Sequence, residues 1–137
     1  RGLGDVYKRQ HQLIWEKFIC NVMCSAPCAA FECNIGELFA DKDRRQVALG
    51  CLIEAHEIGI AKGIHFSFED VLAYGTKFAE LMPNANPSMR LDHLAGRKSE
   101  IDAINGMVPM LGKELGIATP YNDTVVALVR SKEASFH

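Results

Sequence analysis

The sequence lacks the features that mark several large classes of protein. No apolar run in its 137 residues is long enough to cross a bilayer, so no membrane association is expected. The formal net charge is only −2, and acidic and basic residues are mixed along the chain, so we expect no binding to nucleic acid. Repeats and low-complexity segments are also absent. With 48% hydrophobic residues, the chain is predicted to form one soluble globular domain.

Metal-binding motifs are missing too, because the sequence contains no CxxC, HxxxH or HExxH. Five cysteines are present, and Cys20, Cys24 and Cys28 share one face of a helix. Three thiols at that spacing suit a soft metal, but zinc sites usually pair their ligands more closely. A free cysteine behaves as a small buried hydrophobe. We therefore assign no metal and predict reduced core cysteines in a cytoplasmic protein.

No stretch alternates apolar and polar residues over the length of a strand, so the predicted fold is all-α. Pro87 suits a first helical position after an Asn86 cap, and Ser99 to Asp102 resembles a capping box. Asn34 to Gly36 is predicted to be a turn. About six helices are expected, over approximately residues 12–31, 43–62, 67–82, 87–95, 99–115 and 121–133.

Residues 1–10, Arg-Gly-Leu-Gly-Asp-Val-Tyr-Lys-Arg-Gln, differ in character from the rest of the chain. They resemble the translated read-through of a sequencing-library adapter. We therefore interpret them as a non-native leader and place the domain at residues 11–137.

The first predicted helix carries a polar stripe on an otherwise apolar surface. Lys17, Asn21 and Ser25 recur at intervals of four residues, so they lie on one face. Lysine is rarely buried without a partner. The stripe therefore either faces solvent or lines a cavity.

Two further polar residues begin predicted helices. Glu100 shares a face with Ile104, Met107 and Leu111, so it either stabilises its own helix end or pairs with Lys17. Ser88 is either an ordinary first-turn serine or part of an anion site. Two more carboxylates, Glu54 and Asp92, are weaker candidates.

Together these motifs resemble the C-terminal helical domain of the ketopantoate reductase family. That domain has the 6-phosphogluconate dehydrogenase C-terminal-like fold. The similarity runs from about residue 13 to residue 133 in the family's order and spacing. The matching pieces are Trp15-x-Lys17-x-x-x-Asn21, Glu54 nine residues before Gly63, Ser88-Met89-x-x-Asp92, Arg97-x-x-Glu100-Ile-Asp102 with Asn105-Gly106, and Gly116-Ile-x-Thr-Pro120-x-Asn122.

The resemblance implies an activity and a role for each site residue. Family members transfer hydride from NADPH to ketopantoate, a small 2-keto acid, and form pantoate for coenzyme A synthesis. Lys17 matches the lysine that polarises the carbonyl and protonates the alkoxide, and Glu100 matches the supporting catalytic carboxylate. Asn21 and Ser88 match substrate-binding positions. A homodimer is also expected, because an uncovered apolar surface favours self-association.

Three departures from the family pattern affect these expectations. Ser25 and Ala85 stand where family members often carry asparagine, and both positions belong to the substrate pocket. The GxGxxG turn of the NADPH-binding Rossmann domain does not occur in the sequence. We therefore expect the substrate part of a reductase whose Rossmann domain is missing from this chain, and no cofactor-binding residue is assigned. The alternatives are a reductase of another branched 2-keto acid and a non-enzymatic helical interaction domain.

Overall fold

The computed structural model describes residues 2–137, and all regular structure in this range is helical. The all-α prediction is confirmed, with seven α-helices among the described residues where about six were expected. The helices are α1 (Leu3–Phe31), α2 (Ile35–Ala40), α3 (Lys42–Ala61), α4 (Val71–Glu80), α5 (Ser88–Leu94), α6 (Met107–Leu115) and α7 (Pro120–Glu133), with a short 3-10 helix η1 (Ile101–Ala103) before α6.

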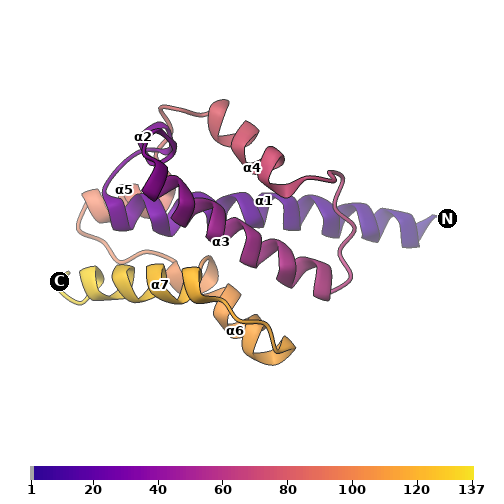
Figure 1. Ribbon diagram of the computed structural model, residues 1–137. Coiled ribbons are helices and arrows are strands. Elements are labelled where there is room, and N and C mark those ends of the chain that lie inside the picture. The colour runs from indigo at the N-terminus through magenta and orange to yellow at the C-terminus, as the bar shows by residue number, and fades with distance from the viewer. Residues whose placement is uncertain (1) are drawn as a thin grey trace.

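Helix α1 is the axis of the molecule, and α3, α5 and α7 pack against it. Figure 1 shows α4 on one side of the α1–α3 pair and α6 and α7 on the other, while the first turns of α1 project beyond the other helices. The core lies where α1, α3 and α7 meet. Its fully buried side chains include Ile19, Met23, Leu52, Ile58, Val125 and Val129.

A buried polar network ties these three helices together. The amide of Asn105 donates to the Val22 carbonyl (2.8 Å) and accepts from the Ala26 N–H (3.1 Å), two groups that pair with each other in a regular α-helix. It also donates to the side chain of Asn122 (2.9 Å). Asn122 in turn donates to Glu54 on α3 (2.9 Å). Every member is satisfied, so the network fixes how the helices pack.

The starts of two helices differ from the prediction. Residues 34–36, predicted as a turn, open α2, where Asn34 and Glu37 form a capping box. Helix α4 begins at Val71, because the carboxylate of Asp70 accepts from the Ala73 N–H and caps it there. The predicted start at Ser67 is wrong, since that residue donates its N–H to Glu16 on α1.

The predicted fifth helix is broken into η1 and α6. Ser99 does not cap it, because its N–H and its hydroxyl both donate to Glu133 on α7. Glu100 therefore does not continue the helical face of Met107 and Leu111. Asn86 is not the cap of α5 either, since Pro87 occupies that position without a side-chain bond.

Other predictions are confirmed. Helices α3 and α7 agree with the expected ranges to within one residue. All five cysteines are free and buried. The predicted start of the first helix near residue 12 is wrong, because α1 begins at Leu3 and continues through residues 3–10, which are all exposed. Within residues 2–137, no helix has both the length and the apolar character needed to cross a membrane.

Candidate active site

A groove between α1 and α4 contains two of the residues predicted for the site. Lys17 and Asn21 stand one turn apart on its α1 wall, and both are exposed. The groove has a volume of about 440 Å³, within the range of small-molecule sites. It is lined by Leu13, Glu16, Lys17, Cys20, Asn21, Tyr74, Phe78 and Met82.

The Lys17 wall is fixed by hydrogen bonds to the segment between α3 and α4. The side-chain amide of Gln12 donates to the His65 carbonyl (2.6 Å), and the buried carboxylate of Glu16 accepts from the Ser67 N–H (2.7 Å). Gln12 and Glu16 are one helical turn apart on α1, just before Lys17. They hold this part of α1 against a loop that leads directly into the opposite wall.

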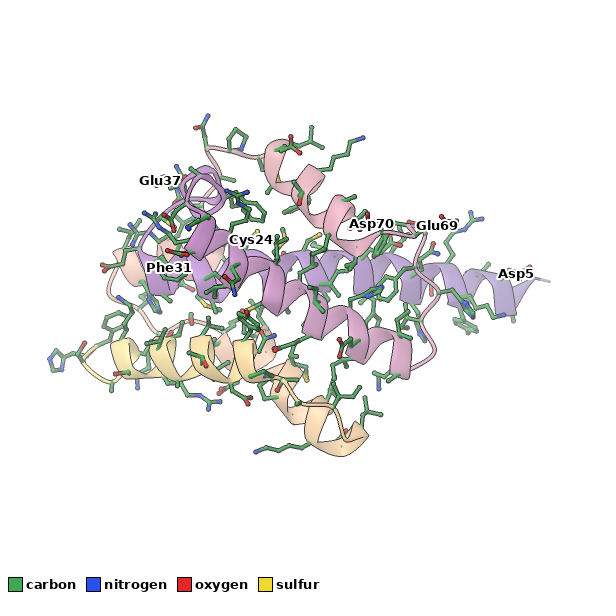
Figure 2. All side chains as sticks on the ribbon, viewed as in Figure 1. Asp5, Cys24, Phe31, Glu37, Glu69 and Asp70 are labelled. Carbon is green, nitrogen blue, oxygen red and sulfur yellow. The ribbon has the colours of Figure 1, made fainter. Side chains whose placement is uncertain are left out.

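The α4 wall is aromatic and supported from behind. The Tyr74 ring stacks on Phe68 with centroids 4.2 Å apart, and Phe68 contacts Phe66 at 5.2 Å. Figure 2 shows Glu69 and Asp70 just before α4, toward the projecting end of α1 that carries Asp5. The cap at Asp70 thus sets where α4 starts, and Tyr74 and Phe78 lie on the side of α4 that lines the groove.

The groove holds one exposed cation, Lys17, and its described lining includes one carboxylate, the buried Glu16. Burial raises the pKa of the Cys20 thiol to about 12, and the Glu16 carboxylate adds to this effect. Burial also raises the pKa of Tyr74 above its ordinary value. Both groups are therefore uncharged at neutral pH. In the described part of the chain Lys17 forms no ion pair, so its ammonium can meet an anionic or carbonyl oxygen in the groove.

Ser25, the third member of the polar stripe, lies inside the protein with 4% of its surface exposed. Its neighbour Ala26 is hydrogen-bonded to Asn105, so the loop after η1 covers this turn of α1. The stripe is therefore divided. Lys17 and Asn21 face the groove, whereas Ser25 faces the core.

Ser88 and Glu100 are exposed but do not line this groove. Ser88 is the first residue of α5, and the loop before it is docked on α2 by the bond from the Gly36 N–H to the Pro83 carbonyl (2.8 Å). Glu100 immediately precedes η1. No ion pair joins Glu100 to Lys17 within residues 2–137. Convergence of these residues on one substrate stays a prediction.

The two weaker carboxylate candidates have structural contacts. Glu54 is buried, and its carboxylate accepts from the N–H groups of Tyr121 (2.8 Å) and Asn122 (2.9 Å) in the first turn of α7. It therefore caps that helix, and its negative charge interacts favourably with the positive end of the helix dipole. Asp92 pairs with Arg97 at 3.2 Å.

The aromatic wall was missed by sequence reasoning, although a signal for it exists. Tyr74, Phe78 and Met82 recur at intervals of four residues, as Lys17 and Asn21 do on the other wall. Such a stripe is more often core than binding surface. Its function as a groove wall depends on how α4 packs, which the sequence spacing does not give. Among the described residues, no three His, Cys, Asp or Glu side chains are grouped to hold a metal ion.

Comparison with known proteins gives consistent matches. The family described as "Ketopantoate reductase PanE/ApbA C terminal" matches residues 10–133. A 2-dehydropantoate 2-reductase from Streptococcus pyogenes serotype M3 (strain ATCC BAA-595 / MGAS315) is 36% identical over 122 residues, covering 88% of this chain. The chain spans only 40% of the length of that relative.

Solved structures show the same arrangement of helices. A PanE/ApbA family ketopantoate reductase from Ralstonia eutropha JMP134 superposes with a TM-score of 0.82 at 31% identity, over 90% of this chain and 41% of its own. D-mandelate dehydrogenase in complex with NADH gives a TM-score of 0.80 at 29% identity, over 93% of this chain and 44% of its own.

Proposed function

The chain belongs to the ketopantoate reductase family as its C-terminal helical domain, and we propose that it is the substrate-binding part of an NADPH-dependent 2-dehydropantoate 2-reductase. The reaction would reduce the ketone of ketopantoate to the alcohol of pantoate. The observation that carries this proposal is the exposed Lys17 ammonium in the α1–α4 groove, the residue to which the family resemblance assigns the catalytic role.

The proposed role of Lys17 follows from where charge develops. When hydride reaches the keto carbon, the carbon–oxygen π bond breaks and its electron pair moves to oxygen. An ammonium beside that oxygen stabilises the alkoxide and then transfers a proton to it. Lys17 suits this role because no carboxylate of the described chain is paired with it.

The remaining residues are proposed to bind and orient the substrate. Asn21, one turn from Lys17 on the same wall, can donate and accept hydrogen bonds with the keto acid. The exposed Ser88 hydroxyl is assigned to the substrate carboxylate, and Glu100 to the substrate hydroxyl. The assignments of Ser88 and Glu100 rest on the family motifs. They require both side chains to come close to the Lys17 wall when substrate binds.

Hydride transfer also needs a bound nicotinamide. We propose that a Rossmann domain outside these 137 residues holds NADPH, as the family resemblance implies. The D-mandelate dehydrogenase structure contains NADH, so both cofactors belong in the test. The isolated chain is expected to reduce no keto acid at a measurable rate. A homodimer stays a prediction.

A second candidate function is the reduction of a 2-keto acid with a larger apolar group. The observation that favours it is the wall of Tyr74, Phe78 and Met82, which offers aromatic and thioether contacts beside Lys17. Similarity to D-mandelate dehydrogenase also supports a substrate with a larger apolar group. Ketopantoate is small and carries a hydroxyl, whereas this wall has little to hydrogen-bond with beyond the Tyr74 hydroxyl.

The test joins this chain to the dinucleotide-binding domain of the Streptococcus relative and follows NADPH or NADH oxidation. Ketopantoate, 2-ketoisovalerate and phenylglyoxylate are compared by kcat/KM. The first proposal predicts that ketopantoate is the best substrate. A preference of about tenfold or more for phenylglyoxylate would support the second candidate, since that ratio is about 1.4 kcal/mol of transition-state binding. Cofactor binding without turnover of any keto acid would favour a non-enzymatic interaction domain.

A further inference from the structure

A second pocket lies at the other end of α1, far from the groove. It has a volume of about 370 Å³ and is formed by the end of α1, by α5 and by the end of α7. Glu32, at its edge, is fifteen residues beyond Lys17, which is roughly 22 Å along the helix at ~1.5 Å per residue. The proposed keto acid site therefore does not extend into this pocket.

Arg90 on α5 lines the pocket without a partner for its charge. Its buried Nε has no hydrogen-bond acceptor among the described residues. No carboxylate within residues 2–137 forms an ion pair with it. An unpaired buried guanidinium nitrogen is costly, because the desolvated donor makes no bond in return. Nε is too enclosed to be reached from the pocket, so an acceptor there can meet the guanidinium only through its terminal N–H groups, for which the described chain supplies no ion pair.

The other charged groups around the pocket are already paired. The Lys132 ammonium lies 3.4 Å from the Glu32 carboxylate, and His93 lies 2.8 Å from Glu133. Glu133 accepts from Ser99 as well. Neither carboxylate is thus left over for Arg90. Lys132 forms one ion pair and has three N–H donors, so it can bind a second acceptor in the pocket.

One side of the pocket is apolar, while Ser135 adds a hydroxyl that donates to the Lys132 carbonyl. Phe136 stands edge-on to the His93 ring with centroids 5.1 Å apart, and Leu94 lines the same space. The volume exceeds that of an inorganic ion, since a single water occupies about 30 Å³ in the liquid. A ligand that suits this pocket has one anionic group and a short apolar portion.

From this geometry we propose that the pocket binds a small organic oxyanion, a carboxylate or a phosphate monoester. Its oxygens bond to the Arg90 guanidinium and to Lys132, and its apolar portion lies against Leu94 and Phe136. A guanidinium matches both oxyanions because its parallel N–H groups reach two oxygens at once. This site is independent of the reductase proposal, since it shares no residue with the groove.

The test is a nitrogen–proton NMR titration of the intact 137-residue chain with isobutyrate, methyl phosphate and inorganic phosphate. Sodium chloride at equal ionic strength controls for screening. Amides in segments 29–33, 90–94 and 132–136 should shift with saturation for at least one organic anion, and more weakly for inorganic phosphate. Comparison of isobutyrate with methyl phosphate identifies which oxyanion the pocket prefers.

Matched variants decide whether Arg90 carries the binding. Arg90→Met keeps an apolar stem against α1 and should weaken binding at least about tenfold. Arg130→Met removes the same charge from an exposed arginine already paired with Asp102, and should change affinity by less than about twofold. Arg90→Lys keeps the charge and serves as a second test if the methionine variant unfolds. It should bind the anion more weakly than the parent protein. Unsaturated shifts scattered over the surface, or equal affinities of the Arg90 and Arg130 variants, would overturn the proposal.

Discussion

Asn105 makes three hydrogen bonds that join the loop before α6 to α1 and α7. It satisfies the Val22 carbonyl and the Ala26 N–H of α1 and donates to Asn122 of α7, and it is fully buried. Asn105→Ala removes these three bonds, takes the Asn105 donor from the buried Asn122 side chain and opens a small cavity. The free energy of unfolding should fall by about 3 kcal/mol, measured by urea denaturation at pH 7.

The matched control is the exposed Asn86, which makes no capping bond at α5. Asn86→Ala should change the free energy of unfolding by less than about 0.5 kcal/mol. Equal losses for the two asparagines would mean that the Asn105 network is not what joins α1 to α7.

Glu133 makes stability depend on pH. Burial by itself raises the pKa of this carboxyl, but hydrogen bonds from Ser99 and with His93 outweigh it and hold the pKa below its ordinary value. A depressed folded-state pKa contributes stability above the unfolded pKa of about 4.3, and that contribution is lost as pH falls through the folded value. Glu133→Gln should therefore cost about 1–2 kcal/mol at pH 7 and progressively less below about pH 4.

Urea denaturation at pH 7 and at pH 3.5 measures the Glu133 effect. Glu114→Gln provides the control, because that carboxylate is exposed on α6. A cost for Glu133→Gln that stays constant between the two pH values would contradict the depressed pKa.

At the scale of the element, the start of α4 depends on one capping residue. The Asp70 carboxylate accepts from the Ala73 N–H at 3.1 Å, whereas the Ser67 side chain takes no part in the cap. Asp70→Ala should lower the free energy of unfolding by about 1 kcal/mol. Ser67→Ala should have an effect below about 0.5 kcal/mol. Urea denaturation of both variants tests the assignment. A larger loss of unfolding free energy for Ser67→Ala than for Asp70→Ala would indicate that the helix starts at Ser67.

The helices that the sequence predicts best are those whose signals are local. Helix α7 begins at a proline in the first position and carries an apolar face, so its range was correct to within one residue. The break between η1 and α6 was not predictable in this way. Ser99 fits the local sequence pattern of a capping box. In the structure, however, its N–H and hydroxyl donate to Glu133, which is distant in sequence.

In the site, too, local spacing predicts some features, whereas others depend on contacts distant in sequence. The spacing of Lys17 and Asn21 was enough to place them on one face, and the structure puts both on the wall of a groove. Ser25 has the same spacing but is buried, because the loop carrying Asn105 covers that turn. Burial of a helix face depends on contacts far apart in sequence, here seventy-nine residues between Ala26 and Asn105.

At the scale of the whole molecule, the groove is open and its cation is exposed. The chain spans about 40% of the length of its curated relatives, and in the proposed function it forms the substrate side of a shared active site. In the proposed reaction Lys17 gives the proton to the reduced keto acid. Positioned general acids of this kind contribute substantially to turnover but little to folding.

The most direct test is the turnover number of Lys17→Met in the chain joined to a dinucleotide-binding domain, with saturating NADPH and ketopantoate. Lys77→Met, on the exposed face of α4, is the control for loss of a charge. We expect a fall in kcat of roughly 10²–10⁴-fold for Lys17→Met, with unchanged helical circular dichroism, and near-parent activity for Lys77→Met. A Lys17→Met enzyme within about threefold of the parent kcat would rule out Lys17 as the proton donor, because the proton would then come from another group.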